Sequence, residues 1–290
     1  MLLGVWAIAA TLIGGAAPAH ATPGALDRSF GHGGKTLTAV DLDSGWDGAS
    51  IQAAIAPNGD ILVAAGARLA RYLPEGRLDP NFGDGGLLKI ELPGGLGFSL
   101  GDLAVDPHGA AVVIGTATDD SAPRSSSSAA FLRYRNDGSP DPSFGGDGVM
   151  LTNFGLQASA TDPSAPPVTA TLGAVDSAGR VIAVGGALRP FLYCAHGDIE
   201  RRDELIARLT PDGQLDPTFG DGGIRLFSPS LRMTGMALGE AGESTFAGMP
   251  GNCLASPELA VACSASTPTA LRPSRWILPR FGTSTTGHGR

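Results

Sequence analysis

The chain has 290 residues, 42% of them hydrophobic and 17% charged, which is enough apolar material for a core and excludes a disordered protein. Its 43 glycines and 22 prolines favour many turns and short strands over long helices. The net charge is −8, and Lys35 and Lys89 are the only lysines. No basic stripe is available to neutralise a phosphate backbone, which argues against a nucleic-acid partner.

The first 21 residues have the pattern of a signal peptide. An apolar run from Leu2 to Ala17 is followed by Ala19, His20 and Ala21, the small-x-small pattern that signal peptidase recognises. We expect cleavage before Thr22 and a secreted or periplasmic protein. The run is shorter than the ~20 residues that span a bilayer, and no later stretch is long enough, so we expect no membrane span after cleavage. No Lys or Arg precedes the run, so either the true start lies upstream or the α-amine alone supplies the positive charge.

An eleven-residue motif then recurs four times. The copies read GALDRSFGHGG at 24–34, GRLDPNFGDGG at 76–86, GSPDPSFGGDG at 138–148 and GQLDPTFGDGG at 213–223. Residues 273–282 keep two prolines, a Phe and a Gly in register, and we interpret them as a decayed fifth copy. The alternative is a frameshifted or truncated gene end. We therefore expect a repeat domain over 22–282 and a disordered tail over 283–290.

The segments between the motifs predict four strands per period. Residues 53–65, 103–115, 172–185 and, more weakly, 236–248 each consist of an apolar run, a turn with Gly and a second apolar run, which is typical of a β-hairpin. Third strands are expected at 69–73, 131–135 and 205–209, and fourth strands after the motifs at 35–40, 87–92 and 224–227. Four strands per repeat are typical of a propeller blade. The sequence thus predicts an all-β, β-propeller-like array of about four four-stranded units, which either closes or remains a partial, open arc.

The period lengthens through insertions, which we expect between the third and fourth strands. They comprise the Ser-rich residues Ser121–Ser128 and the charged residues Arg189–Asp203. Insertions on one face of a repeat array often form binding surfaces, although surface loops also tolerate extra length without any function.

The repeated motif, G-x-L-D-x-x-F-G-x-G-G after a hairpin, resembles the delta-60 repeat family. Copies one, two and four match it closely, whereas copy three has Pro140 in place of Leu. The resemblance implies a secreted or surface-attached bacterial protein with propeller-like β repeats. It implies no defined activity and no catalytic residues.

Two residues of the motif are candidates for a structural or a binding role. An Asp at this place caps a turn, and the alternative is calcium binding by Asp79 with Asp84 or by Asp216 with Asp221. Each loop offers fewer than the ~6 to 8 oxygens that calcium needs, which favours the turn. We expect the Phe to fill the space between adjacent units rather than to stack on a ligand. The residues are Asp27, Asp79, Asp141 and Asp216, with Phe30, Phe82, Phe144 and Phe219.

The three cysteines suit an oxidising compartment, with one disulfide and one free thiol. Cys253 can pair with Cys194, in a comparable loop of the preceding repeat, or with Cys263, which is close in sequence. Neither pairing is favoured, and the C-x-x-C spacing of zinc or redox sites is absent.

The sequence contains no H-E-x-x-H or Walker motif, and we expect no catalytic residue and no cofactor other than calcium. His196 lies among acidic residues, but a solvated loop explains this cluster better. The predicted function is a secreted, non-catalytic binding or scaffold module for an unknown protein or carbohydrate. One alternative is a propeller enzyme, such as a lyase or a quinoprotein-like dehydrogenase, although the expected innermost strands are almost wholly apolar. The other is a truncated fragment without a function of its own.

Overall fold

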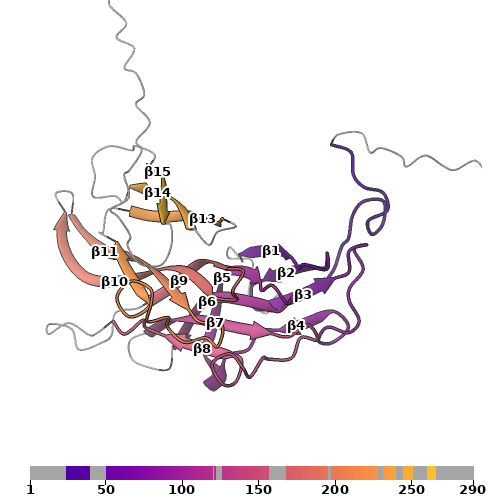
Figure 1. Cartoon of the computed structure of the whole chain (residues 1–290), viewed down its shortest axis with the longest axis horizontal. Helices are drawn as coiled ribbons and strands as arrows, with labels where there is room; N and C mark the ends of the chain where they lie inside the picture. The colour runs from indigo at the N-terminus through magenta and orange to yellow at the C-terminus, as the bar shows by residue number, and fades with distance from the viewer. Residues whose placement is uncertain are drawn as a thin grey trace, which may run out of the picture.

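The computed structural model describes residues 24–39, 50–119, 121, 126–156, 168–194, 197–227, 231–239, 244–250 and 260–265. In this part of the chain, strands β1 to β15 form four antiparallel sheets, with one short 3-10 turn at Pro93–Gly95. The all-β prediction is therefore confirmed, and Figure 1 shows the sheets following one another as propeller-like units.

Each sheet is one repeat unit whose strands pair in chain order. Unit 1 contains β1 (Ile51–Ile55), β2 (Ile61–Ala65), β3 (Arg68–Tyr72) and β4 (Leu87–Lys89). Unit 2 contains β5 (Gly97–Val105), β6 (Ala111–Asp119), β7 (Ser126–Tyr134) and β8 (Val149–Thr152). Unit 3 contains β9 (Val168–Val175), β10 (Val181–Cys194), β11 (Gly197–Leu209) and β12 (Ile224–Phe227). The described strands of unit 4 are β13 (Leu231–Leu238), β14 (Ser244–Pro250) and β15 (Ala260–Ala265).

Two expectations about strands were wrong. The insertions Ser121–Ser128 and Arg189–Asp203 lie between the second and third strands of their units, because they lengthen the strands of that hairpin. Strands β6 and β7 have nine residues each, against five in β2 and β3, and β10 and β11 extend further still (Figure 1). Residues 35–39, in the expected fourth strand of the first motif, form no strand and make only a bridge from Gly31 to Lys35.

The second strands are apolar without alternation because both faces of an inner sheet are covered. Strand β6 is buried from Ala111 to Ala117, since unit 1 packs on one of its faces and unit 3 on the other. Strands buried on both faces are typically continuous hydrophobic runs, as seen in β6.

The core is divided among the junctions between consecutive units. Units 1 and 2 meet around Leu62, Phe82 and Val113, and units 2 and 3 meet around Ile114 and Phe144. A smaller cluster joins units 3 and 4, where Val184 and Ile206 lie with Met233 and Phe246. Burial of apolar surface therefore holds each unit to the next, as in other repeat arrays.

Candidate functional site

The motif aspartates organise the loops that lie at one edge of the units. In each copy the Oδ1 atom accepts a hydrogen bond from the backbone N–H two residues later, which fixes a tight turn. The distances are 2.9 Å for Asp27, 3.0 Å for Asp79, 3.1 Å for Asp141 and 2.9 Å for Asp216. The Phe three residues later is fully buried in the second and third copies (Phe82 and Phe144) and half-buried in the first and fourth (Phe30 and Phe219).

An arginine eight residues before the motif aspartate is the site residue that the sequence analysis missed. The Nε atom of Arg133 lies 2.8 Å from Oδ2 of Asp141, and the Nε atom of Arg208 lies 2.7 Å from Oδ2 of Asp216. The guanidinium of each also lies over the motif Phe, 5.0 Å from the ring centre of Phe144 in the first case. A signal was present in the sequence, because the third strands LARYL, FLRYR and LIARL each carry an Arg in register.

Unit 1 uses the same arginine differently. The Nε atom of Arg71 lies 3.6 Å from Oδ2 of its motif aspartate, Asp79, because the guanidinium pairs with Asp60 on the hairpin turn instead. The Nη2 atom of Arg71 is 2.7 Å from Asp60 Oδ2, and its Nε–H donates to the same oxygen at 2.9 Å. The residue at the end of the hairpin turn therefore decides which carboxylate the arginine contacts.

Hydrogen bonds also cross the junction between units 1 and 2 and the junction between units 2 and 3. The N–H of Gly83 donates to the carbonyl of Asp137 at 2.8 Å, and that of Gly145 donates to the carbonyl of Asp212 at 2.9 Å. The Nη1 atom of Arg133 donates to the carbonyl of Pro211 in the next unit at 2.6 Å. The motif loop of one unit is therefore fastened to the turn after the third strand of the next.

The pKa values of two motif aspartates follow from these contacts. Burial raises the pKa of Asp141, but hydrogen bonds from Ser143 and the charge of Arg133 outweigh it, so the pKa lies below its ordinary value of 3.8. Asp216 has the same balance with Thr218 and Arg208. Both carboxylates are thus held in the ionised form.

Polar groups on the inner strands are likewise used to join units. Gln52 on β1 donates from Nε2 to the carbonyl of Gly101 at 3.0 Å. Asp102, at the corresponding position of β5, accepts the N–H of Gly173 in unit 3 at 2.9 Å. Burial raises the pKa of Asp102, while the N–H groups of Gly173 and Leu103 oppose the shift. These side chains hold neighbouring first strands together.

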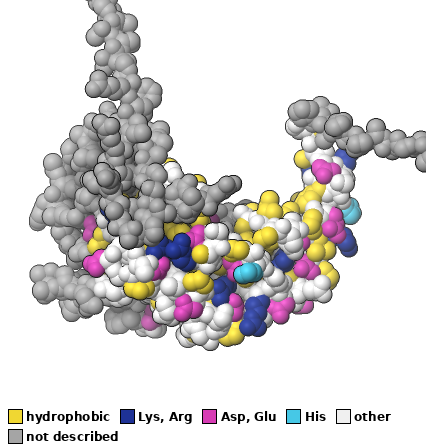
Figure 2. Space-filling model, in the orientation of Figure 1, with side chains coloured by type: hydrophobic (Ala, Val, Ile, Leu, Met, Phe, Trp, Pro, Cys, Tyr) yellow, Lys and Arg dark blue, Asp and Glu magenta, His cyan; other side chains and the backbone are white. Residues whose placement is uncertain are grey.

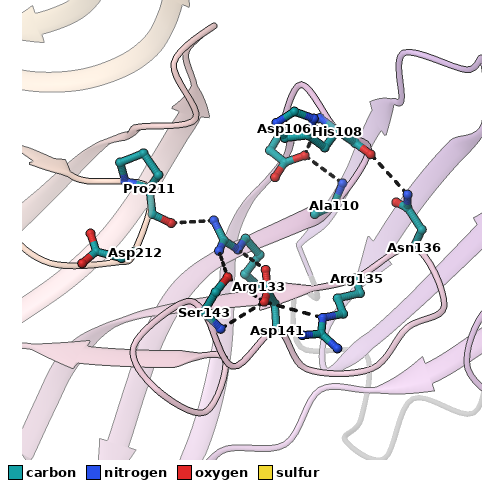
Figure 3. Close-up of a pocket in the computed structure, with 10 residues that line it drawn as sticks. All are labelled: Asp106, His108, Ala110, Arg133, Arg135, Asn136, Asp141, Ser143, Pro211 and Asp212. Carbon is teal, nitrogen blue, oxygen red and sulfur yellow. Dashed lines mark hydrogen bonds and ion pairs between the residues drawn. The ribbon is translucent and has the colours of Figure 1, made fainter.

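A surface pocket of about 540 Å³ opens where units 2 and 3 meet (Figure 3). Arg133 forms its base, with a side chain that is only 10% exposed and contacts with Asp141, Ser143 and Pro211. Its contact with Asp141 is ionic, because the Nε–H bond does not point at an acceptor. Arg135, 53% exposed, lies at the mouth with Nε 3.6 Å from Asp141 Oδ1. The remaining lining residues are Asp106, His108, Ala110, Asn136 and Asp212.

The pocket depends on two departures of unit 2 from the repeat. Ala110 occupies the position at which unit 1 has Asp60 and unit 3 has Arg180, so a methyl group replaces a long or charged side chain in front of Arg133. Arg135 occupies the position of Leu73 in unit 1 and Thr210 in unit 3. These residues supply space and an exposed cation that the repeat itself does not provide.

The structure does not bring the calcium candidates into a metal site. Asp79 and Asp216 are buried beside Arg71 and Arg208, whereas Asp84 and Asp221 are exposed. Over the described ranges, no group of three or more His, Cys, Asp or Glu side chains could hold a metal ion. Calcium binding at these positions stays the less favoured alternative to the turn-capping role.

Several other predictions fall on parts of the chain outside the description. These are the signal peptide, Cys253, His196, the decayed fifth copy and the tail. Cys194 lies in β10 and Cys263 in β15, at positions where only the backbone is described, so both disulfide pairings stay predictions. No helix in the described part is long and apolar enough to cross a membrane.

Residues 112–144 and 202–219 match a family described as a domain of unknown function (DUF5122), beta-propeller. The first stretch runs from β6 to Phe144 and the second from within β11 to Phe219, so each contains one arginine, aspartate and phenylalanine set. No curated protein matches the chain. The fold and this similarity together define a propeller-like β-repeat protein.

Proposed function

We propose that the protein is a secreted, non-catalytic binding module built of delta-60-type repeats, and that the pocket between units 2 and 3 binds a saccharide. The observation that carries the proposal is the pair of departures from the repeat, Ala110 and Arg135, which meet at one pocket. A residue that only maintains the array is expected to recur in every unit, whereas a binding residue is expected at one place.

The chemistry of the lining favours a polyhydroxyl ligand. Arg135, Asn136 and His108 provide donors, while Asp106 and Asp212 provide acceptors, so hydroxyl groups that both donate and accept hydrogen bonds are matched. The volume lies within the ~300 to 1,000 Å³ that is usual for small-molecule sites. Cations and carboxylates occur together in the lining, which favours a neutral ligand over a strongly charged one.

Secretion is supported by the apolar segment at the start of the chain and by the three cysteines. Expression of the full chain with a C-terminal tag in a bacterial host tests it. We expect the product in the periplasm or medium, with an N-terminus at Thr22. Full-length product that stays in the cytoplasm would contradict secretion.

The binding proposal is tested by screening the full chain on an array of neutral and acidic oligosaccharides and titrating the best oligosaccharide by calorimetry. Arg135→Leu introduces the residue of unit 1, and we expect it to weaken binding about tenfold or more, as for loss of a hydrogen-bonded charge. Arg77→Leu is the matched control, because the Arg77 side chain is exposed and pairs with Glu75 of its own turn.

Ala110→Asp provides a second test that preserves the fold. It copies the Asp60 arrangement, so the new carboxylate is expected to pair with Arg133 and to fill the pocket. We expect binding to be lost while the melting temperature is unchanged or higher. Binding that survives both substitutions would place the saccharide site elsewhere, and the absence of any bound oligosaccharide would refute the proposal.

A further inference from the structure

One face of unit 1 is apolar and uncovered. Ile51 and Ile55 on β1 are 67% and 73% exposed, and Ala53 between them is also exposed. Figure 2 shows hydrophobic side chains at the surface in this region. Terminal units of a repeat array need a polar outer face for solubility, and this face, with Val63 of β2 beside it, is not polar.

The same positions are used for packing in every later unit. They contact the preceding unit, and we call the surface that they form the leading face. Leu100 and Val105 of unit 2 pack against unit 1, Ala170 and Val175 of unit 3 pack against unit 2, and Met233 and Leu238 of unit 4 pack against unit 3. Ile51 and Ile55 therefore occupy junction positions on which no sheet of the described residues packs.

The N-terminal motif is nevertheless already docked on unit 1 as if a preceding unit existed. The N–H of Gly31 donates to the carbonyl of Glu75 at 2.8 Å, which repeats the bonds of Gly83 and Gly145 at the inner junctions. The Thr36 hydroxyl adds a hydrogen bond to the carbonyl of Gly76 at 2.6 Å. In the part of the chain that the structure describes, no sheet comes before this motif at the junction.

On unit 4, described residues of the opposite, trailing face are exposed. Thr245 and Ala247 are exposed there, at the positions of Leu62 and Ala64 in unit 1. At the junction of units 2 and 3, a small residue faces a large one, because a Cβ on Gly173 of unit 3 would clash with Cδ1 of Ile114 in unit 2. There the large residue is on the trailing face and the small one is on the leading face. Unit 4 has small residues on its trailing face and unit 1 has large ones on its leading face, so these two faces also pair small with large residues.

We propose that the trailing face of unit 4 in a second copy of the chain covers the leading face of unit 1, so that copies associate head to tail. The N-terminal motif of one copy then lies beside the sheet of the other, as each inner motif lies beside its own sheet. The contact is heterologous, so association continues until it closes into a ring or forms a longer assembly.

Sedimentation or light scattering of the full chain over a concentration series tests the proposal. Wild type is expected to form dimers or larger species. Ile55→Asp and Thr245→Arg, both at exposed positions, are each expected to raise the dissociation constant about tenfold or more, because a charge would be buried in the junction. Circular dichroism and melting curves check that both variants fold.

Mixing the two variants decides the geometry. Ile55→Asp retains its trailing face and Thr245→Arg retains its leading face, so the mixture is expected to form a one-to-one dimer although neither variant associates alone. If Thr245→Arg alone associated like wild type, two leading faces would pair and the head-to-tail proposal would be wrong. A monomeric wild type at all concentrations would also overturn it.

Discussion

The close approach between units can be tested at Gly138, in the turn after the third strand of unit 2. Gly138 has φ of +82°, and a Cβ there would lie 2.7 Å from the backbone nitrogen of Gly83 and 3.3 Å from Leu88. That nitrogen makes the hydrogen bond from unit 1 to Asp137. An added methyl group must therefore push the two units apart.

The expected cost of Gly138→Ala has two parts. The left-handed backbone costs about 1–2 kcal/mol for a residue with a Cβ, and loss of the junction hydrogen bond adds about 0.5–1.5 kcal/mol. Displacement of the packed Phe82 region increases the second part. We expect the free energy of unfolding to fall by roughly 2–4 kcal/mol in total.

Gly85→Ala is the matched control, since Gly85 has φ of +60° and no atom within 4 Å of an added Cβ. It is expected to lose only the backbone part, about 1–2 kcal/mol. Urea unfolding followed by far-UV and by near-UV circular dichroism gives the midpoints, and agreement of the two probes tests for a single transition. Equal losses in the two variants would refute the conclusion that the turn of one unit is packed against the motif of its neighbour.

Three further predictions concern the motif residues. Phe144→Ala removes a fully buried ring and is expected to lower the free energy of unfolding by about 3–5 kcal/mol. Phe30→Ala removes a half-buried ring and should lower it clearly less in the same urea assay. Equal losses in the two variants would contradict the packing role. Asp216 has a pKa below 3.8 in the folded protein, so its contribution to stability is present above pH 3.8 and is lost as the pH falls through the folded value. In Asp216→Asn, the melting temperature should therefore fall less steeply with decreasing pH than in wild type. An equally steep fall in both proteins would contradict this role of Asp216. Because Asp79 and Asp216 are beside arginines, we expect added calcium to leave the melting temperature unchanged, and a clear rise would identify the motif loops as ligands.

Much of the fold could be predicted from local patterns. The first hairpin, expected at 53–65, is β1 and β2, and the third strand expected at 69–73 is β3. Alternation, turn glycines and the repeat itself carry this information within a few residues of each element. The position of the insertions was predicted wrongly, because a longer hairpin between the second and third strands and a loop after the third strand have similar polar compositions.

The sequence by itself therefore determined the all-β class, the repeat and the turn-forming loops, because these depend on contacts between residues close in the chain. Only the tertiary structure placed Arg133 on Asp141 and brought Pro211 of the next unit to its side, since the contact with Pro211 joins residues 78 positions apart. It also decided that Ala110 and Arg135 meet at one pocket and that Ile51 and Ile55 remain uncovered. Packing between units sets these features, and the pattern within one repeat does not contain that information.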